Sequence, residues 1–154
     1  MGQAGIEFYD IASPAAFESA PKQAWGFYGH RVALYRKTVP HAGFHILKRW
    51  GDQMPLGYTV FTSNVDGQFQ NAVFDSQRIY ECHGSIHHLQ CLQPCDDSIW
   101  DAQVFEPVVN ESACLQTNEP PQCPRCGGMA RPNVLMFGDW GWISARSTQQ
   151  SKRL

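Results

Sequence analysis

Apolar residues recur at helical spacing through the first third of the chain. Ser13 is an N-cap candidate, and Pro14 follows it at a first helical position, so a short helix is predicted from there to the break at Pro21. A longer helix is predicted over residues 22–38, because apolar side chains recur there at steps of three and four. These side chains are Trp25, Tyr28, Val32 and Tyr35.

A third helix is predicted beyond Pro40, in the sequence HAGFHILKRW. This stretch carries Phe44, Leu47 and Trp50 on one amphipathic face. The turn residues of GDQMPLG then end it.

Two short apolar runs then change the period of the pattern. YTVFTSN, from Tyr58, is β-branched and aromatic without polar alternation, which is typical of a parallel strand covered on both faces. RIYECHG, from Arg78, predicts a second strand that runs into His83 and Gly84. Two strands joined by a crossover indicate an α/β sheet, whose ligands bind beyond the carboxyl ends of the strands.

The remainder of the chain, from Ser85 onward, has weaker periodicity. From Ser85 to Arg131 the sequence is rich in cysteine, proline and acidic residues, which indicates an insertion organised by a metal. RPNVLMFGDWGW is apolar again, and the tail ISARSTQQSKRL is polar and ends without a cap or stop signal.

Composition narrows the class of protein. A chain of 154 residues with 43% hydrophobic and 17% charged residues suits one globular domain, or a small domain with an insertion. Twelve Lys and Arg against fourteen Asp and Glu leave a net charge of -2, which argues against nucleic acid and anionic membranes as partners. The amino end has no signal-peptide pattern, and no apolar run is long enough for a membrane span. We therefore expect a cytoplasmic protein.

The spacing of four of the six cysteines is the strongest chemical signal. Cys91 and Cys95 enclose three residues, and Cys123 and Cys126 enclose two, so two knuckles can close one tetrahedral site. Four thiolates favour a structural Zn²⁺ with no open position for substrate. Glycines after the second knuckle let its backbone turn so that amides approach the sulfurs. The alternative is two pairs of ordinary free thiols.

Other candidate residues carry weaker signals. Cys82 and Cys114 are expected to be buried small hydrophobes, and His87 and His88 to be surface or packing residues, because the cysteines already complete a zinc shell.

His83, at a strand end before Gly84, suits a general base, with a structural histidine as the alternative. Asn64 and Asp66 also follow a strand and could fix a polar ligand, although Asn-x-Asp-Gly is also an ordinary turn sequence.

Four segments in order, TSNVDG, ECHGSIHHLQC, CPRCGG and RPNVLMFGD, resemble the sirtuins, the NAD-dependent protein lysine deacylases. The resemblance extends from Asp10 to Trp142. It implies a partial Rossmann-like parallel sheet with helices and an inserted small zinc-ribbon domain. On this basis residues 1–84 form the partial NAD-binding domain with its helical module, residues 85–131 the zinc domain, and residues 132–154 the substrate loop and the return to the Rossmann-like domain.

The resemblance also implies a chemistry. The acyl oxygen of an acylated protein lysine attacks the anomeric carbon of the nicotinamide ribose of NAD, nicotinamide leaves, and His83 as catalytic base activates a ribose hydroxyl to attack the imidate. The products are free lysine, nicotinamide and an acyl-ADP-ribose. The implied cofactor residues are Ser63, Asn64, Val65 and Asp66, and the implied residues for the acyl-lysine are Val134, Leu135 and Phe137.

Tyr28 and Arg31 resemble the Tyr-x-x-Arg of sirtuins that accept succinyl or malonyl groups. At this spacing a phenol and a guanidinium share a helical face and could clamp a carboxylate. The alternative is an interfacial tyrosine and a solvated arginine.

The sequence departs from the family pattern in three residues and at both ends. Ser63 stands where glutamine is usual, the first knuckle has one extra residue, and Asp139 replaces glutamate. No glycine-rich diphosphate loop precedes Asp10, and no Gly-Thr-Ser follows Trp142. We therefore expect a truncated domain that binds NAD poorly in isolation and exposes sheet edges. The alternative function is a catalytically inactive zinc-ribbon interaction module of sirtuin ancestry.

Overall fold

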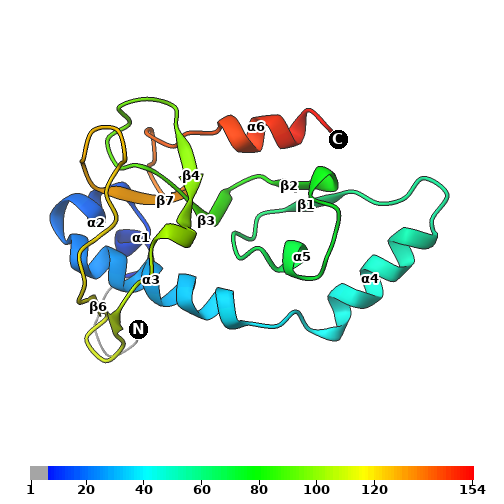
Figure 1. The fold of residues 1–154 in the computed structure, drawn as a ribbon, viewed down its shortest axis with the longest axis horizontal. Coiled ribbons are helices and arrows are strands. Elements are labelled where there is room, and N and C mark those ends of the chain that lie inside the picture. The colour runs from blue at the N-terminus through cyan, green and yellow to red at the C-terminus, as the bar shows by residue number, and fades with distance from the viewer. Residues whose placement is uncertain (1–6) are drawn as a thin grey trace.

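The computed structural model describes residues 7–154. Residues 1–6, which belong to the amino end without a signal-peptide pattern and to the expected domain of residues 1–84, lie outside the described residues. The helices are α1 (Phe8–Ile11), α2 (Pro14–Ser19), α3 (Pro21–Lys37), α4 (Ala42–Gln53), α5 (Gln68–Asn71) and α6 (Ala145–Ser151), with short 3-10 turns at Ser76–Arg78 and Ala102–Val104. The strands are β1 (Val60–Thr62), β2 (Ile79–Glu81), β3 (Gly84–Cys91), β4 (Ile99–Asp101), β5 (Val109–Asn110), β6 (Leu115–Gln116) and β7 (Ala130–Val134). Figure 1 shows their arrangement.

The first two predicted helices are confirmed. The Ser13 hydroxyl accepts a hydrogen bond from the Ala16 amide (3.3 Å) and so caps α2, with Pro14 at its first position. Helix α3 buries Trp25 and Val32, as the spacing predicts. The Trp25 indole also donates to the carbonyl of Ala130 (3.1 Å), which joins α3 to β7 in the main core.

The two predicted parallel strands are present but shorter than expected. β1 and β2 pair in parallel, with Val60 opposite Ile79 and Thr62 opposite Glu81. The expectation that the first strand is covered on both faces is wrong for Phe61, which is 67% exposed and contacts Tyr80 edge-on. Among the described residues, β2 is the only strand paired with β1.

The insertion contains a strand that the pattern did not indicate. β3 is the central strand of an antiparallel sheet in the order β4-β3-β7. Polar side chains are buried along it, and this breaks the hydrophobic signal. The Gln90 side chain accepts from the Asn133 side chain (2.9 Å) and from the Ile143 amide (3.0 Å), and donates to the carbonyl of Gly141 (2.8 Å).

The polar tail, in which the sequence shows no cap or stop signal, forms α6. α6 packs on β2 through polar contacts: the Ser147 hydroxyl donates to the Glu81 carbonyl (2.8 Å), the Glu81 amide donates to the Gln150 side chain (3.0 Å), and Arg146 pairs with the Glu81 carboxylate. Hydrophobic periodicity carries no information about such an interface.

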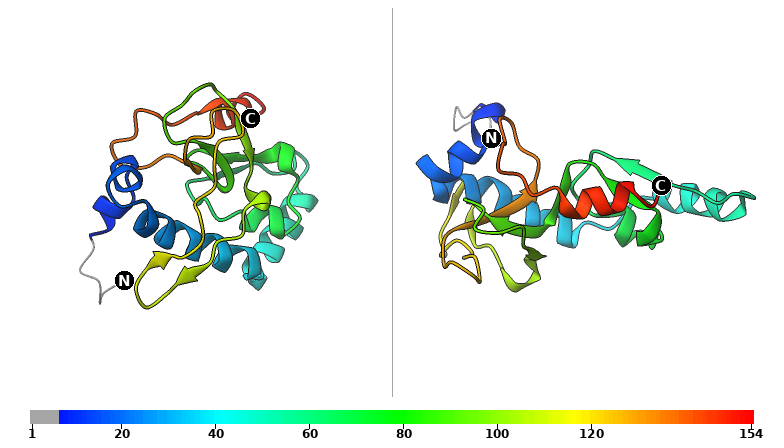
Figure 2. Two further views of the ribbon diagram at one scale, coloured as in Figure 1. Left: turned by 60° about the vertical axis from the view of Figure 1, so that its left-hand side comes forward. Right: turned by 90° about the horizontal axis from the view of Figure 1, so that it is seen from above.

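The third predicted helix, α4, lies at one end of the molecule and extends away from the antiparallel sheet (Figure 1 and Figure 2). Phe44 packs against Phe69 in a small second core around β1 and β2, whereas Leu47 and Trp50 on the predicted amphipathic face are exposed. Within residues 7–154, no helix is both long and apolar enough to cross a membrane.

Candidate functional site

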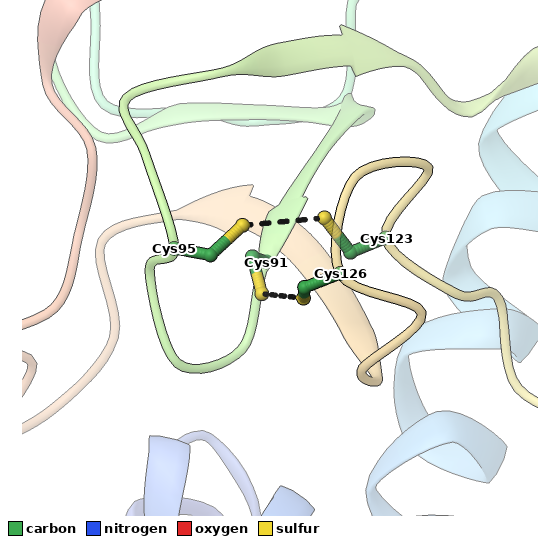
Figure 3. A group of neighbouring side chains, drawn as sticks. All are labelled: Cys91, Cys95, Cys123 and Cys126. Atoms are coloured by element: carbon green, nitrogen blue, oxygen red, sulfur yellow. Dashed lines mark hydrogen bonds between the residues drawn. The ribbon is translucent and has the colours of Figure 1, made fainter.

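Four cysteines from separate segments converge at one end of the antiparallel sheet (Figure 3). Cys91 ends β3, Cys95 follows in the next loop, and Cys123 and Cys126 flank a turn ahead of β7. All four sulfur atoms lie within 4.8 Å of one another. The pair Cys91 and Cys126 is 3.6 Å apart, and the pair Cys95 and Cys123 is 3.7 Å apart.

These separations fit a tetrahedral zinc ion. With zinc–sulfur bonds of about 2.3 Å, the sulfurs of a tetrahedral site are about 3.8 Å apart. Gly127 has a φ of 72°, and the Gly128 amide donates to the sulfur of Cys126 (3.4 Å), so the predicted turn and its amide–sulfur contact are present. Such an amide also supports a metal-bound thiolate.

The surroundings of the cluster shift the pKa values of its thiols in opposite directions. Hydrogen bonds from the backbone around Cys126 lower the pKa of Cys123 to about 7, whereas desolvation raises the pKa of Cys91. Cys82 and Cys114 lie outside the cluster and are half-buried, less than expected.

The second group of candidate residues gathers where the two parallel strands end. The Cys82 amide, just after β2, donates to the carbonyl of Thr62 at the end of β1 (3.0 Å). His83 follows, and its side chain is exposed. The next residue, Gly84, has a φ of 79°, and a Cβ there would lie 2.1 Å from the Asn133 carbonyl oxygen, so only glycine fits.

The loop after β1 is fixed by hydrogen bonds to its neighbours. Ser63 and Asn64 have exposed side chains, and the Asn64 amide donates to the Thr62 hydroxyl (3.1 Å). The Val65 carbonyl accepts from the Ile86 amide of β3 (3.0 Å). The Asp66 carboxylate accepts from the Gln68 amide (3.0 Å), which starts α5.

The segment after β7 meets His83 from the other side. The Leu135 amide donates to the carbonyl of His83 (2.9 Å), and the Phe137 amide donates to the carbonyl of Ala12 (3.0 Å). Val134 is buried, and the side chains of Leu135 and Phe137 are partly exposed. The structure therefore brings the predicted base next to the predicted acyl-lysine segment.

A buried ion pair holds this segment, and only its acidic member, Asp139, stands out in the sequence as a departure from the family pattern. Asp139 and Arg131 form two hydrogen bonds of 2.7 and 2.8 Å, and both side chains are 0% exposed. The Asp139 carboxylate also accepts from the amides of Met136 (3.3 Å) and Gly141 (3.1 Å). The Asp139 carboxylate thus stabilises the turn between Met136 and Gly141 through its hydrogen bonds. Residue spacing could not indicate this role.

Tyr28 and Arg31 lie on one side of α3, and each side chain contacts an aromatic ring of the protein. The Tyr28 ring is buried, stacks on Phe17 (5.5 Å between centroids), and burial raises the pKa of its hydroxyl. The Arg31 guanidinium lies 3.5 Å from the centre of the Phe27 ring and donates to the Phe27 carbonyl (3.2 Å). Desolvation lowers the pKa of Arg31.

The fold and these two groups define an α/β protein with polar strand ends and an inserted four-cysteine module. The Sir2 family profile matches residues 4–149, and the chain belongs to the Sir2 family. An NAD-dependent protein deacylase of Aquifex aeolicus is 32% identical over 130 residues, covering 84% of this chain and 48% of that protein. The corresponding protein of Aeropyrum pernix is also 32% identical over 130 residues, with 84% and 47% covered. The chain thus spans about half the length of these curated relatives.

Solved structures of the family share the fold. A Sir2 homologue in complex with 2'-O-acetyl ADP ribose aligns with a TM-score of 0.70 at 22% identity, covering 87% of this chain and 48% of that chain. A Sir2 protein bound to acetylated peptide aligns with a TM-score of 0.64 at 19% identity, covering 90% and 55%.

Proposed function

We propose that this chain is the central part of an NAD-dependent protein lysine deacylase. The observation that carries the proposal is the junction of β1, β2 and the segment after β7. There the Cys82–Thr62 hydrogen bond brings two polar strand ends together, and the Leu135–His83 hydrogen bond adds an apolar segment. In this proposal NAD supplies the ADP-ribose that accepts the acyl group.

The proposed roles follow from the exposure and chemistry of each side chain. His83 has an exposed imidazole and accepts a proton from a ribose hydroxyl as the catalytic base. Asn64 and Asp66 hold the nicotinamide amide, the first as donor and acceptor and the second as acceptor. Val65 contributes backbone to this pocket, and Ser63 a hydroxyl near the ribose.

The acyl-lysine of a protein substrate occupies the segment after β7 in this proposal. Val134, Leu135 and Phe137 line the methylene stem, for which apolar contacts are favourable. Tyr28 and Arg31 then select the end of the acyl group, and an acidic acyl group would draw Arg31 from the Phe27 ring.

The four cysteines hold a structural Zn²⁺ that joins β3 to β7. No ligand position is left for substrate, so the ion stabilises the module and takes no part in the reaction. The domain division at residues 84 and 131 belongs to the same proposal.

One observation favours a second function, an inactive zinc-ribbon interaction module. Within residues 7–154, β1 pairs only with β2, so its other edge is open beside the exposed Phe61. An open parallel edge is a site for pairing with another polypeptide.

Nicotinamide release separates the two functions. The purified chain is given NAD and an acetylated or succinylated peptide, and its zinc content is measured in parallel. Release that His83→Ala abolishes, and that His45→Ala on exposed α4 leaves intact, supports the deacylase. Arg31→Met should then reduce desuccinylation far more than deacetylation. One zinc per chain without any release, both from this chain and from a chain completed with the flanking segments of a curated relative, supports the inactive module.

A further inference from the structure

We infer that His87 is a positioning residue for the Asn64–Asp66 loop, and this inference rests on the proposed function of that loop. From its sequence context, His87 is expected to have only a surface or packing role. In the structure its Nε2 lies 2.9 Å from the main-chain carbonyl oxygen of Asp66. A carbonyl oxygen accepts hydrogen bonds only, so Nε2 carries the proton.

The chain is shaped to admit this imidazole. The ring lies against Gly67, where a Cβ would be 2.7 Å from the His87 Cδ2 atom. Gly67 also has a φ of 70°, which favours glycine for a second reason. The His87 backbone is held in turn, because its amide donates to the Ser85 hydroxyl (3.3 Å).

The hydrogen bond from His87 complements a second tie between the same two segments. The Ile86 amide, one residue earlier on β3, donates to the carbonyl of Val65 (3.0 Å). Two successive residues of β3 thus bind two successive carbonyls of the loop. These two hydrogen bonds fix the backbone of the loop and thereby orient the side chains of Asn64 and Asp66. His87 thus acts through the loop backbone without touching the substrate.

His88 provides the matched control, because it is the next imidazole on the same strand. It is opposite Asp101 in the β3–β4 pair, and its Nδ1 atom is buried with no hydrogen-bond partner among the described residues. Replacing His88 changes an imidazole of β3 but leaves the hydrogen bonds of β3 to the loop in place.

Amide hydrogen exchange on the intact chain tests the positioning role without requiring turnover. His87→Phe keeps a flat ring under Gly67 but removes the donor, and His87→Gln can restore an N–H at a similar reach. We expect His87→Phe to speed exchange of the Gln68 amide about five- to tenfold, the effect of one lost hydrogen bond. His87→Gln should recover most of this protection, and His88→Phe should leave the Gln68 amide unchanged. Equal exchange in His87→Phe and the parent chain overturns the inference.

Two further readings separate this inference from the proposed function. Nitrogen NMR should find the neutral His87 ring protonated on Nε2, and a ring protonated on Nδ1 contradicts the inference. NAD is then added as the probe: extra protection of residues 64–68 in the parent and His87→Gln chains, but not in His87→Phe, supports both proposals. Faster exchange in His87→Phe with no effect of NAD on any chain supports the positioning role and contradicts NAD binding by this chain.

Discussion

Val73 adopts a backbone conformation that β-branched residues rarely take. Its φ is 63°, in the left-handed region, and its side chain is 74% exposed, so no burial offsets the strain. Left-handed backbone costs an L-residue about 1–2 kcal/mol, whereas glycine avoids the cost but loses about 0.4–1 kcal/mol through the entropy of the unfolded chain.

We therefore expect Val73→Gly to raise the free energy of unfolding by about 1 kcal/mol and Tm by about 2–4 °C. Val39→Gly is the control, because Val39 is also exposed but has no positive φ, and it should lower Tm slightly. Thermal unfolding followed by circular dichroism measures both, and a fall in Tm for both variants would contradict the strain argument.

The Arg131–Asp139 pair predicts a large loss of stability from a single side chain. Asp139→Ala leaves the guanidinium buried and without its counter-ion, which costs about 3–5 kcal/mol. Asp52→Ala breaks the exposed pair of Asp52 with Lys48, where water screens the charges, and should cost far less than Asp139→Ala. Urea unfolding distinguishes them, and similar costs for the two variants would refute a special role for the buried pair.

At the residue scale, the sequence predicts chemistry where spacing along the chain fixes geometry. The two cysteine knuckles are of this kind, and their sulfurs converge as expected. Spacing says nothing about the tautomer of His87 or the two hydrogen bonds of Asp139, because these depend on segments that meet only in the folded chain.

At the element scale, prediction succeeded where burial follows period and failed where contacts are polar. Helix α2 follows from its start signals Ser13 and Pro14, helix α3 from apolar spacing, and the parallel pair β1–β2 from short apolar runs. Helix α6 and strand β3 do not, because Glu81 and Gln90 form their interfaces through hydrogen bonds. One side of α4 carries the apolar spacing of a buried face, but no described segment covers it, so Leu47 and Trp50 are exposed.

The half-buried His88 of β3 predicts a dependence of stability on pH. Burial, followed by the positive charge of Arg146, lowers the pKa of His88 to about 4, although Glu81 and Asp101 oppose the shift. The unfolded chain therefore binds more protons than the folded chain between pH 4 and 6.5. Stability should fall as pH falls through this window and be unaffected by His88 above it.

Because the His88 ring is only half-buried, we expect this contribution to be about 1–2 kcal/mol. His88→Gln should reduce the loss of stability between pH 7 and pH 5, as measured by urea unfolding. His45→Gln, on exposed α4, should leave the dependence unchanged. A parent chain as stable at pH 5 as at pH 7 would disprove the assignment.

At the scale of the whole molecule, the zinc module connects segments far apart in the sequence. Chelation should release one zinc and lower Tm by about 10 °C or more, because metal binding contributes directly to folding free energy. Cys95→Ser should lose the metal, whereas Cys82→Ser should keep one zinc, because Cys82 lies outside the cluster. Mass spectrometry under native conditions counts the ion, and zinc retention by Cys95→Ser would exclude the four-cysteine site.

The same connection has a consequence for the time course of folding. β3 must find β7 across the long segment 92–129, and the entropy of closing that loop slows pairing of the two strands. The cysteine knuckles lie at the two ends of the same segment, so a zinc ion that joins them closes the loop before the strands meet. The rate at which newly made chains mature should therefore rise with the supply of free zinc and level off once the ion binds faster than the strands pair.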